Sequence, residues 1–367
     1  MPEKSLAVVL TAPREFEVRE FDIPEIGPED AIMKMEAAGI CGSDIGGSLR
    51  LDRGPKILGH ENIGIIHKIG AIASKRWRVQ EGDRVAVEEY IPCGSCDRCR
   101  AGEYRFCTQT DISYREGERL WYGSTPIATA PALWGGFSQY MYLHPQCVVH
   151  KVTKDVSPEE AALYIAFSNG VEWAYKLGGV KLGDTVVVQG PGQQGLGCVI
   201  AAKEAGAERI IVTGLTRDAK RFAIAKKLGA TDTVDVLTEN FVDKIKDITN
   251  GHGADVVVNV SGGGKGTVAD AMAVASQDST IVLPAPGKEL MSFEGVGRRN
   301  ITIKMAHGHS YDSVEKAIYF IGMNKYPLRD LCTHQFGFEG AREAVLAVAG
   351  EGAAAGDAIH VSILPPK

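Results

Sequence analysis

The stretch V-V-V-Q-G-P-G-Q-Q-G-L-G, residues 186–197, decides the fold of the central part of this chain. Three valines form an apolar strand, and glycines follow it before an apolar helical stretch. Glycines at this spacing allow a tight turn and let an anion approach the N–H groups at a helix N-terminus. In this context, G-x-G-x-x-G predicts a site for the pyrophosphate of a dinucleotide. The residues expected to bind it are Gly190, Gly192, Gln193, Gln194 and Gly195; the alternative is a tight βα turn that binds nothing.

Apolar strands and helical stretches alternate around this turn. The strand-like segments are T-V-V-V-Q (185–189), I-I-V-T (210–213), T-V-D-V (233–236), D-V-V-V-N-V (255–260), T-I-V-L-P (280–284) and I-T-I-K-M (301–305). Apolar strands separated by helices are typical of a parallel sheet that is covered on both faces. Residues 166–308 are therefore predicted to form a doubly wound α/β domain.

Residues 1–165 have a different character, with short β-rich segments broken by Gly and Pro. Examples are L-A-V-V-L (6–10), A-I-M-K-M (31–35), I-G-I-I-H-K-I (63–69) and R-V-A-V (84–87), which predict a mostly β domain. S-P-E-E, residues 157–160, predicts a helix start with Ser157 as its cap. The tail, residues 309–367, ends in A-I-H-V-S-I-L, a strand expected to complete the first domain.

The segment I-I-V-T-G-L-T-R-D-A-K-R, residues 210–221, bears on the form of the dinucleotide. An acidic residue at the end of this strand usually binds the ribose hydroxyls of NAD. Gly214 stands there instead, and Thr216, Arg217 and Lys220 follow closely. A missing carboxylate with cations nearby suits the 2′-phosphate of NADP, so NADP is favoured over NAD. Two alternatives stay open: Asp218 turns back to the ribose of NAD, or the segment is a solvated helix start that binds nothing.

Four of the eight cysteines lie in one window, C-G-S-C-D-R-C-R-A-G-E-Y-R-F-C, residues 93–107. In a reducing compartment, such a cluster binds metal more often than it forms disulfides. The expected ligands of a tetrahedral structural zinc are Cys93, Cys96, Cys99 and Cys107. Gly94 and Gly102 would let the backbone fold tightly around the ion. A site with four protein ligands has no open position and supports a loop; the alternative is a chance cluster of reduced thiols.

Composition limits the possible partners. The chain has 367 residues, 44% hydrophobic and 23% charged, enough for about two globular domains. Its net charge of -6 comes without long charge runs, so neither nucleic acid nor an acidic membrane surface is an expected partner. The N-terminal residues lack a signal-peptide pattern, and no stretch reaches the roughly 18 apolar residues of a membrane span. We expect a cytoplasmic protein.

The stretch I-L-G-H-E-N-I-G, residues 57–64, places a histidine and a glutamate side by side at the start of an apolar run. Burying both is costly unless they are paired or bound to a metal. The stretch occurs with A-G-I-C-G-S-D (38–44), G-D-R-V-A-V (82–87), the four-cysteine window, G-G-F-S-Q-Y (135–140) and the glycine-rich turn. Together these motifs resemble the zinc-containing medium-chain alcohol and polyol dehydrogenases over nearly the whole chain. The resemblance implies a GroES-like catalytic domain, residues 1–165 and 309–367, and a Rossmann dinucleotide-binding domain, residues 166–308.

The same resemblance implies roles for five residues. Cys41 and His60 match ligands of a catalytic zinc, and Glu61 matches a residue that is a near or alternating ligand in many members. Asp44 matches the acid that orients the metal-bound imidazole. Ser43 matches the hydroxyl that takes the first step of proton relay from the alcohol.

Two positions depart from the family pattern. Gly46 stands where some members continue the proton relay with a histidine, so the rest of the path must differ. Ile165, in A-A-L-Y-I-A-F-S-N-G, stands where members usually offer a third zinc ligand. Three accounts follow: zinc is held by Cys41, His60 and Glu61; another residue supplies the third ligand; or the catalytic zinc is lost.

The expected function is that of an NAD(P)-dependent and zinc-dependent oxidoreductase, an alcohol dehydrogenase that interconverts a secondary alcohol and a ketone. The alternatives are a zinc-independent reductase of activated double bonds with the same fold, and a cofactor-binding protein without turnover. The family implies a small-molecule substrate and a homodimer or homotetramer. Aromatic side chains after the cysteine window either line an apolar substrate pocket or form loop core: Trp121, Tyr122, Trp134 and Phe137.

Overall fold

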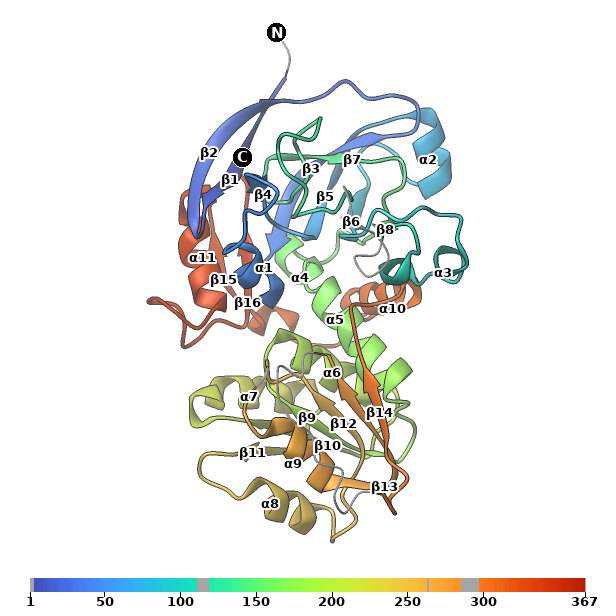
Figure 1. Ribbon diagram of the computed structural model, residues 1–367, viewed down its shortest axis with the longest axis vertical. Coiled ribbons are helices and arrows are strands. Elements are labelled where there is room, and N and C mark those ends of the chain that lie inside the picture. Colours follow the sequence, from blue (N-terminus) through green and yellow to red (C-terminus); the bar gives the residue numbers. More distant parts are fainter. Residues whose placement is uncertain (1–2, 111–118, 263, 285–296, 367) are drawn as a thin grey trace. The chain divides into compact units, whose positions relative to one another are not determined.

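The computed structural model describes residues 3–110, 119–262, 264–284 and 297–366. The chain divides into two compact units. Unit 1 comprises Met1–Tyr164 and Ile318–Lys367, and unit 2 comprises Ile165–Ala317. Figure 1 shows the strands and helices of each unit.

Unit 2 contains a six-stranded sheet in the order β11-β10-β9-β12-β13-β14, with every neighbouring pair parallel. From the first strand, β9, the chain adds β10 and β11 outward on one side and then β12, β13 and β14 outward on the other. This is the 3-2-1-4-5-6 order of a dinucleotide-binding fold, so the predicted Rossmann domain is confirmed. The strands are β9 (Thr185–Gln189), β10 (Arg209–Gly214), β11 (Asp232–Asp235), β12 (Ala254–Asn259), β13 (Ala275–Leu283) and β14 (Thr302–Met305).

Helices pack on this sheet because apolar residues on both faces must be covered (Figure 1). Val187, Ile211 and Val257 of the central strands are fully buried beneath them. The helices of the unit are α5 (Tyr164–Gly170), a π-helix (Val171–Leu177), α6 (Gln193–Glu204), α7 (Ala219–Leu228), α8 (Phe241–Ile248), α9 (Thr267–Val274) and α10 (Tyr311–Gly322), the first and last of which cross the boundary with unit 1.

Unit 1 is mostly β, as predicted. A seven-stranded sheet has the order β15-β16-β3-β5-β6-β8, with β7 also paired to β3, and a smaller sheet has the order β2-β1-β4. The C-terminal strand β16 pairs antiparallel with β3, so the tail completes this unit. The strands are β1 (Lys4–Ala12), β2 (Glu15–Asp22), β3 (Ala31–Gly39), β4 (Lys56–Ile57), β5 (Glu61–Ile69), β6 (Arg84–Val87), β7 (Tyr140–Leu143), β8 (Val149–Lys151), β15 (Cys332–Phe336) and β16 (His360–Ile363).

The predicted cap at Ser157 is present. Its Oγ accepts from the backbone N–H of Glu160, and the Glu160 carboxylate accepts from the backbone N–H of Ser157. The helix that follows, α4 (Pro158–Ala161), is one turn long.

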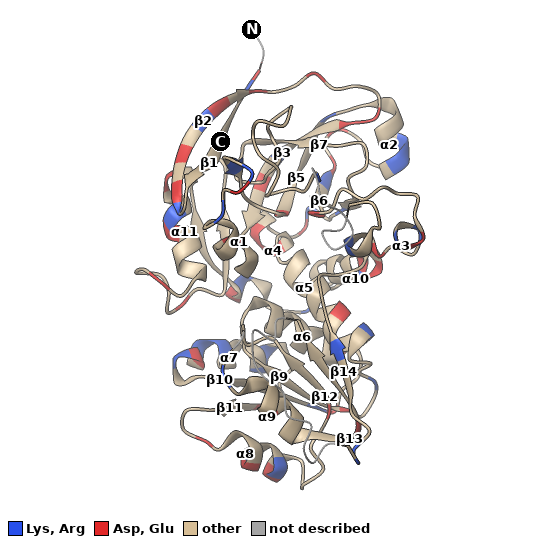
Figure 2. Ribbon diagram, in the orientation of Figure 1, with Lys and Arg blue, Asp and Glu red and all other residues tan. Residues whose placement is uncertain are grey.

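Charged residues lie along the outer strand β2, which has four acidic side chains and one basic side chain, Arg19 (Figure 2). Charges on an edge strand oppose pairing with another chain. Among the described residues, no helix is both long and apolar enough to cross a membrane.

Candidate active site

Cys41, His60 and Glu61 come together in unit 1. Cys41 directly precedes the short helix α1 (Gly42–Gly47), while His60 and Glu61 lie at the start of β5. One ligand atom from each of the three residues lies within 4.8 Å of the others. A thiolate, an imidazole and a carboxylate form a donor set that zinc accepts. Within the described part of the chain this group has three members, which leaves one position of a tetrahedron for water or substrate.

Asp44 holds two of these residues in place. One of its oxygens, Oδ2, accepts from the backbone N–H of Cys41 at 2.9 Å, and Oδ1 lies 3.3 Å from His60 Nδ1. The carboxylate therefore selects the tautomer with the proton on Nδ1 and leaves Nε2 available to a metal. Ser43 Oγ lies 3.3 Å from that Nε2. The structure thus brings together all five residues that were assigned to the catalytic site.

The electrostatics of this group suit a cation. The pKa of Glu61 is raised to about 8, chiefly by burial and also by the charges of Asp44 and Glu89, although His60 and Cys41 act in the opposite direction. Burial alone lowers the pKa of His60, but the charge and hydrogen bond of Asp44, aided by Cys41, outweigh it and the net pKa lies well above 6.5. Several acidic groups thus share a buried space, and a divalent cation stabilises their charged forms.

The four cysteines of the lobe form a second group whose sulfur atoms lie within 4.8 Å of one another. Cys99 Sγ lies 3.8 Å from Cys93 Sγ and 3.5 Å from Cys96 Sγ. Sulfur atoms bound tetrahedrally to one zinc lie about 3.8 Å apart, because each Zn–S bond is about 2.3 Å long. Backbone N–H groups point at the sulfurs, and that of Cys99 contributes most to lowering the pKa of Cys96 to about 5. Gly94 and Gly102 have φ of 70° and 73°, the conformation expected of glycines in such a turn.

The glycine-rich turn between β9 and α6 fits a dinucleotide. Gly190 has φ of 105°, which favours glycine, and a Cβ on Gly195 would collide with Gly190 O. Gly192, the residue before α6, has nothing within 4 Å of the place where a Cβ would stand. This open space lies at the N-terminus of a 12-residue helix without an acidic first turn, where a pyrophosphate is favoured. Gln193 and Gln194 begin the helix.

The comparisons with known proteins agree with this geometry. Residues 27–154 match the model of the alcohol dehydrogenase GroES-like domain, and residues 195–322 match that of the zinc-binding dehydrogenases. A probable alcohol dehydrogenase of Mycobacterium tuberculosis is 37% identical over 361 residues, which cover 94% of each chain. The chain belongs to the zinc-binding, medium-chain dehydrogenases.

Other relatives extend the comparison. Sorbitol dehydrogenase of Bacillus subtilis is 30% identical over 355 residues, 94% of each chain. A crystal structure of an Escherichia coli oxidoreductase of unknown specificity superposes with a TM-score of 0.85 at 25% identity and covers 100% of both chains. A Sinorhizobium meliloti structure, assigned as a zinc-binding dehydrogenase and bound to NADP, has a TM-score of 0.82 at 25% identity and covers 99% of this chain and 100% of its own. Zinc and NAD(P) are thus the cofactors that the family brings to this dehydrogenase.

In this dehydrogenase, the basic side chains of Arg217 and Lys220, in the segment after β10, are exposed. Gly214 ends the strand, and Thr216 and Arg217 are exposed. Asp218 is buried, accepts from the backbone N–H of Leu215 at 2.9 Å and pairs with Arg221 at 2.9 Å. Its carboxylate is therefore used within its own turn, and Oδ2 lies 3.0 Å from the place where a Cβ on Gly214 would stand.

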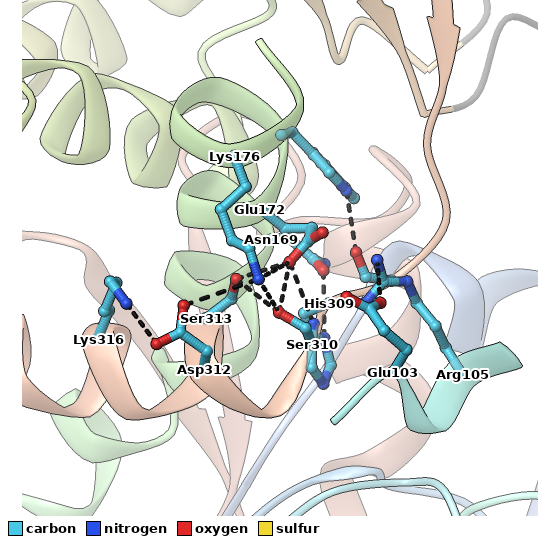
Figure 3. Close-up of polar contacts among 12 residues, drawn as sticks. Glu103, Arg105, Asn169, Glu172, Lys176, His309, Ser310, Asp312, Ser313 and Lys316 are labelled. Atoms are coloured by element: carbon cyan, nitrogen blue, oxygen red, sulfur yellow. Dashed lines mark hydrogen bonds and ion pairs between the residues drawn. The ribbon is translucent and has the colours of Figure 1, made fainter. Parts of the chain in front are cut away.

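A polar cluster in unit 2 escaped the sequence analysis (Figure 3). Glu172, 2% exposed in the π-helix, accepts through Oε2 from Ser310 Oγ and Ser313 Oγ, each at 2.7 Å, and from the backbone N–H of Ser310. Lys176 donates to Ser310 Oγ at 2.8 Å, and Asn169 Oδ1 lies 3.2 Å from His309 Nδ1. The cluster ties the π-helix to the start of α10. Its signal in the sequence is a glutamate and a lysine, Glu172 and Lys176, at i,i+4 spacing in a mostly apolar helical segment.

Most of the aromatic residues after the cysteine lobe of the dehydrogenase belong to its core. Tyr122, Trp134 and Phe137 are at most 2% exposed and join the hydrophobic core of unit 1. These three aromatic residues are therefore part of the core, which is the second of the two roles expected from the sequence.

Proposed function

We propose that this dehydrogenase interconverts a secondary alcohol and a ketone with zinc and NAD(P). The observation that carries the proposal is the convergence of Cys41, His60 and Glu61, within 4.8 Å, in a chain that also contains an open glycine turn for a dinucleotide. The names of its relatives, alcohol dehydrogenase and sorbitol dehydrogenase, support the same reaction class. Unit 1 would be the catalytic domain and unit 2 the dinucleotide-binding domain.

The catalytic roles follow from the contacts in the site. Cys41, His60 and Glu61 would hold the catalytic zinc, which supplies a Lewis acid that lowers the pKa of a bound alcohol. Asp44 orients His60 through Nδ1. Ser43 accepts the hydroxyl proton of the alcohol as the first relay group, since its hydroxyl is exposed and lies beside His60 Nε2.

The redox step is a hydride transfer between the alcohol and the nicotinamide. NAD(P) would accept the hydride of the carbinol carbon, while exposed Ser43 would take the hydroxyl proton and release its own hydroxyl proton to solvent. The C–O bond becomes a carbonyl, and the reverse sequence reduces the ketone. Cys93, Cys96, Cys99 and Cys107 would hold the structural zinc and take no part in this step.

The cofactor form is proposed to be NADP. Exposed Thr216 and Arg217 follow Gly214, and Asp218 is occupied by Leu215 and Arg221. The NADP bound to the Sinorhizobium meliloti relative supports the same choice. Asp235 acts against it, because its carboxylate accepts from Thr216 Oγ1 at 2.6 Å and would repel a nearby phosphate. Michaelis constants for both cofactors test the choice, and a clear preference for NAD contradicts it.

The functional test is a panel of secondary alcohols and ketones, run with both cofactors on protein of measured zinc content. We expect turnover that a zinc chelator abolishes, with about two zinc ions per chain. Turnover of activated alkenes at one zinc per chain would identify the zinc-independent reductase. Cofactor binding without turnover of any compound would identify a non-catalytic protein.

The cellular setting and assembly are also proposals. None of the eight cysteines forms a disulfide, which suits the reducing cytoplasm. The family's common assemblies make a homodimer or homotetramer the expected state. Light scattering on the purified protein measures it, and a monomeric mass contradicts it.

A further inference from the structure

The π-helix of unit 2 holds the short segment that follows β14, residues 306–310. Trp173 Nε1 donates to Gly308 O at 3.0 Å. Glu172 Oε2 accepts from the backbone N–H of Ser310 at 3.3 Å and from its Oγ at 2.7 Å, and Figure 3 shows these two side chains facing each other. These contacts, the π-helix clamp, fix the segment at two points.

The clamped segment lies at the carboxyl edge of the parallel sheet. It directly follows β14, and the backbone N–H of Ala306 donates to Leu283 O, at the end of β13, at 3.2 Å. With this strand order, a dinucleotide lies across the carboxyl ends of the strands, one mononucleotide on each half of the sheet. The glycine-rich turn after β9 belongs to the first half, and the clamped segment ends the second. His307 is exposed and His309 is buried, so the segment is held on one side and accessible on the other.

The helical run that carries the clamp also packs against α6, the helix that begins at the glycine-rich turn. A Cβ on Gly170, directly before the π-helix, would collide with the backbone of Gly197 in α6. A Cβ on Gly197 would stand 2.6 Å from Ala166 O in α5. Glycines at both positions therefore let the two helices touch backbone to backbone. One helical run thus contacts the helix of the first half and the last segment of the second half.

We propose that Glu172 and Trp173 are positioning residues for the nicotinamide half of the dinucleotide. The π-helix clamp fixes the segment beside the nicotinamide, in a constant relation to the turn that binds the pyrophosphate. Glu172 is 2% and Trp173 4% exposed, so each acts through the segment that it holds. π-Helical turns are rare and occur often at functional sites, which agrees with this role. The inference rests on the proposed function, which places NAD(P) on unit 2.

The test compares binding of the whole cofactor with binding of its adenosine half alone. The fragment is adenosine 2′,5′-bisphosphate if the enzyme prefers NADP, or AMP if it prefers NAD. Trp173→Phe keeps an aromatic ring and removes the donor to Gly308 O, and Glu172→Gln removes the charge that Ser310 faces. Each variant should bind the whole cofactor about five- to tenfold more weakly, the effect of one lost hydrogen bond. Both should bind the fragment as the wild type does.

Ile245→Val is the matched control for lost stability. Ile245 is fully buried in α8, and shortening it removes packing without removing a bond of the π-helix clamp. Its melting temperature should fall, while its dissociation constants for cofactor and fragment should equal those of the wild type.

The outcomes distinguish this inference from the proposed function. A wild type that binds neither NAD nor NADP overturns both. A wild type that binds, with Trp173→Phe and Glu172→Gln equal to it, overturns the positioning role alone. Equal weakening of cofactor and fragment also overturns that role, because the loss then comes from unit 2 as a whole. If Glu172→Gln does not fold, Trp173→Phe decides.

Discussion

Replacing Asp44 by Asn tests how the site holds a metal. Asp44 is 3% exposed and serves two donors, the backbone N–H of Cys41 and Nδ1–H of His60. An asparagine keeps one acceptor oxygen and presents an NH2 group to the other donor. A buried donor without a partner costs about 1–3 kcal/mol. Since 1.4 kcal/mol is tenfold, zinc affinity should fall roughly 10- to 100-fold, the range seen when a residue behind a metal ligand is changed.

Near neutral pH, protons compete with zinc for the imidazole of His60, and this competition makes the difference in zinc affinity between wild type and Asp44→Asn smaller. Asp44 contributes to the raised pKa of His60, so zinc must displace a proton from the wild-type imidazole at any pH below that pKa. In Asp44→Asn the pKa of His60 falls, and less proton competition remains. The difference in zinc affinity between wild type and variant should therefore grow as the pH rises.

A chelator competition assay at pH 7 and pH 9 measures both effects. Asp52→Asn is the control, because Asp52 is exposed and Asp44 is the carboxylate that contacts Cys41 and His60. The zinc of the cysteine lobe gives an internal reference in each protein. Equal zinc affinities for wild type and Asp44→Asn at pH 9 would refute the reasoning, and so would a difference that shrinks as the pH rises.

Three further predictions concern other parts of the molecule. Gly195→Ala should weaken NAD(P) binding at least tenfold in a fluorescence titration, because its Cβ would collide with Gly190 O and deform the turn; undiminished binding contradicts this. Cys99→Ser should remove one zinc per chain by metal analysis and lower the melting temperature; a retained second zinc argues against the four-sulfur site. Glu172→Gln should lower the free energy of unfolding by about 1–3 kcal/mol, since a buried acceptor of three hydrogen bonds loses its charge. Exposed Glu208→Gln should change it little, and equal effects would refute the burial argument.

The parts of the fold that the sequence predicted are those set by local patterns. Apolar runs near residues 186, 211 and 257 mark buried strands because a parallel sheet needs apolar residues on both faces. The cap at Ser157 and the turn at Gly190 were also visible, since each depends on residues within a few positions. The extent of α4 was not, because its single turn ends where the chain enters the next helix.

The surroundings of the site depend on contacts that are distant in sequence. His360 and Glu61 both lie beside Gly39 because β16 and β5 pair with β3; the sequence predicted a strand in the tail, but not the strand that it pairs with. Glu172 resembles a solvated helical glutamate until the start of α10 covers it. Asp44 was recognised through the family motif, whereas its bond to the backbone N–H of Cys41 is a detail of the structure.

Ile165 stands where the family usually has a third zinc ligand, and the charges of Cys41, His60 and Glu61 can account for this difference. In the proposed site, a thiolate from Cys41 and a carboxylate from Glu61 would together neutralise a divalent ion, while His60 would bind as a neutral imidazole. A ligand at position 165 would add a third negative charge if it were acidic, and would weaken the Lewis acidity on which alkoxide formation depends. With Glu61 held over Gly39, zinc needs no carboxylate from position 165. In the proposed site, an aliphatic residue at 165 therefore costs neither charge balance nor an open coordination position.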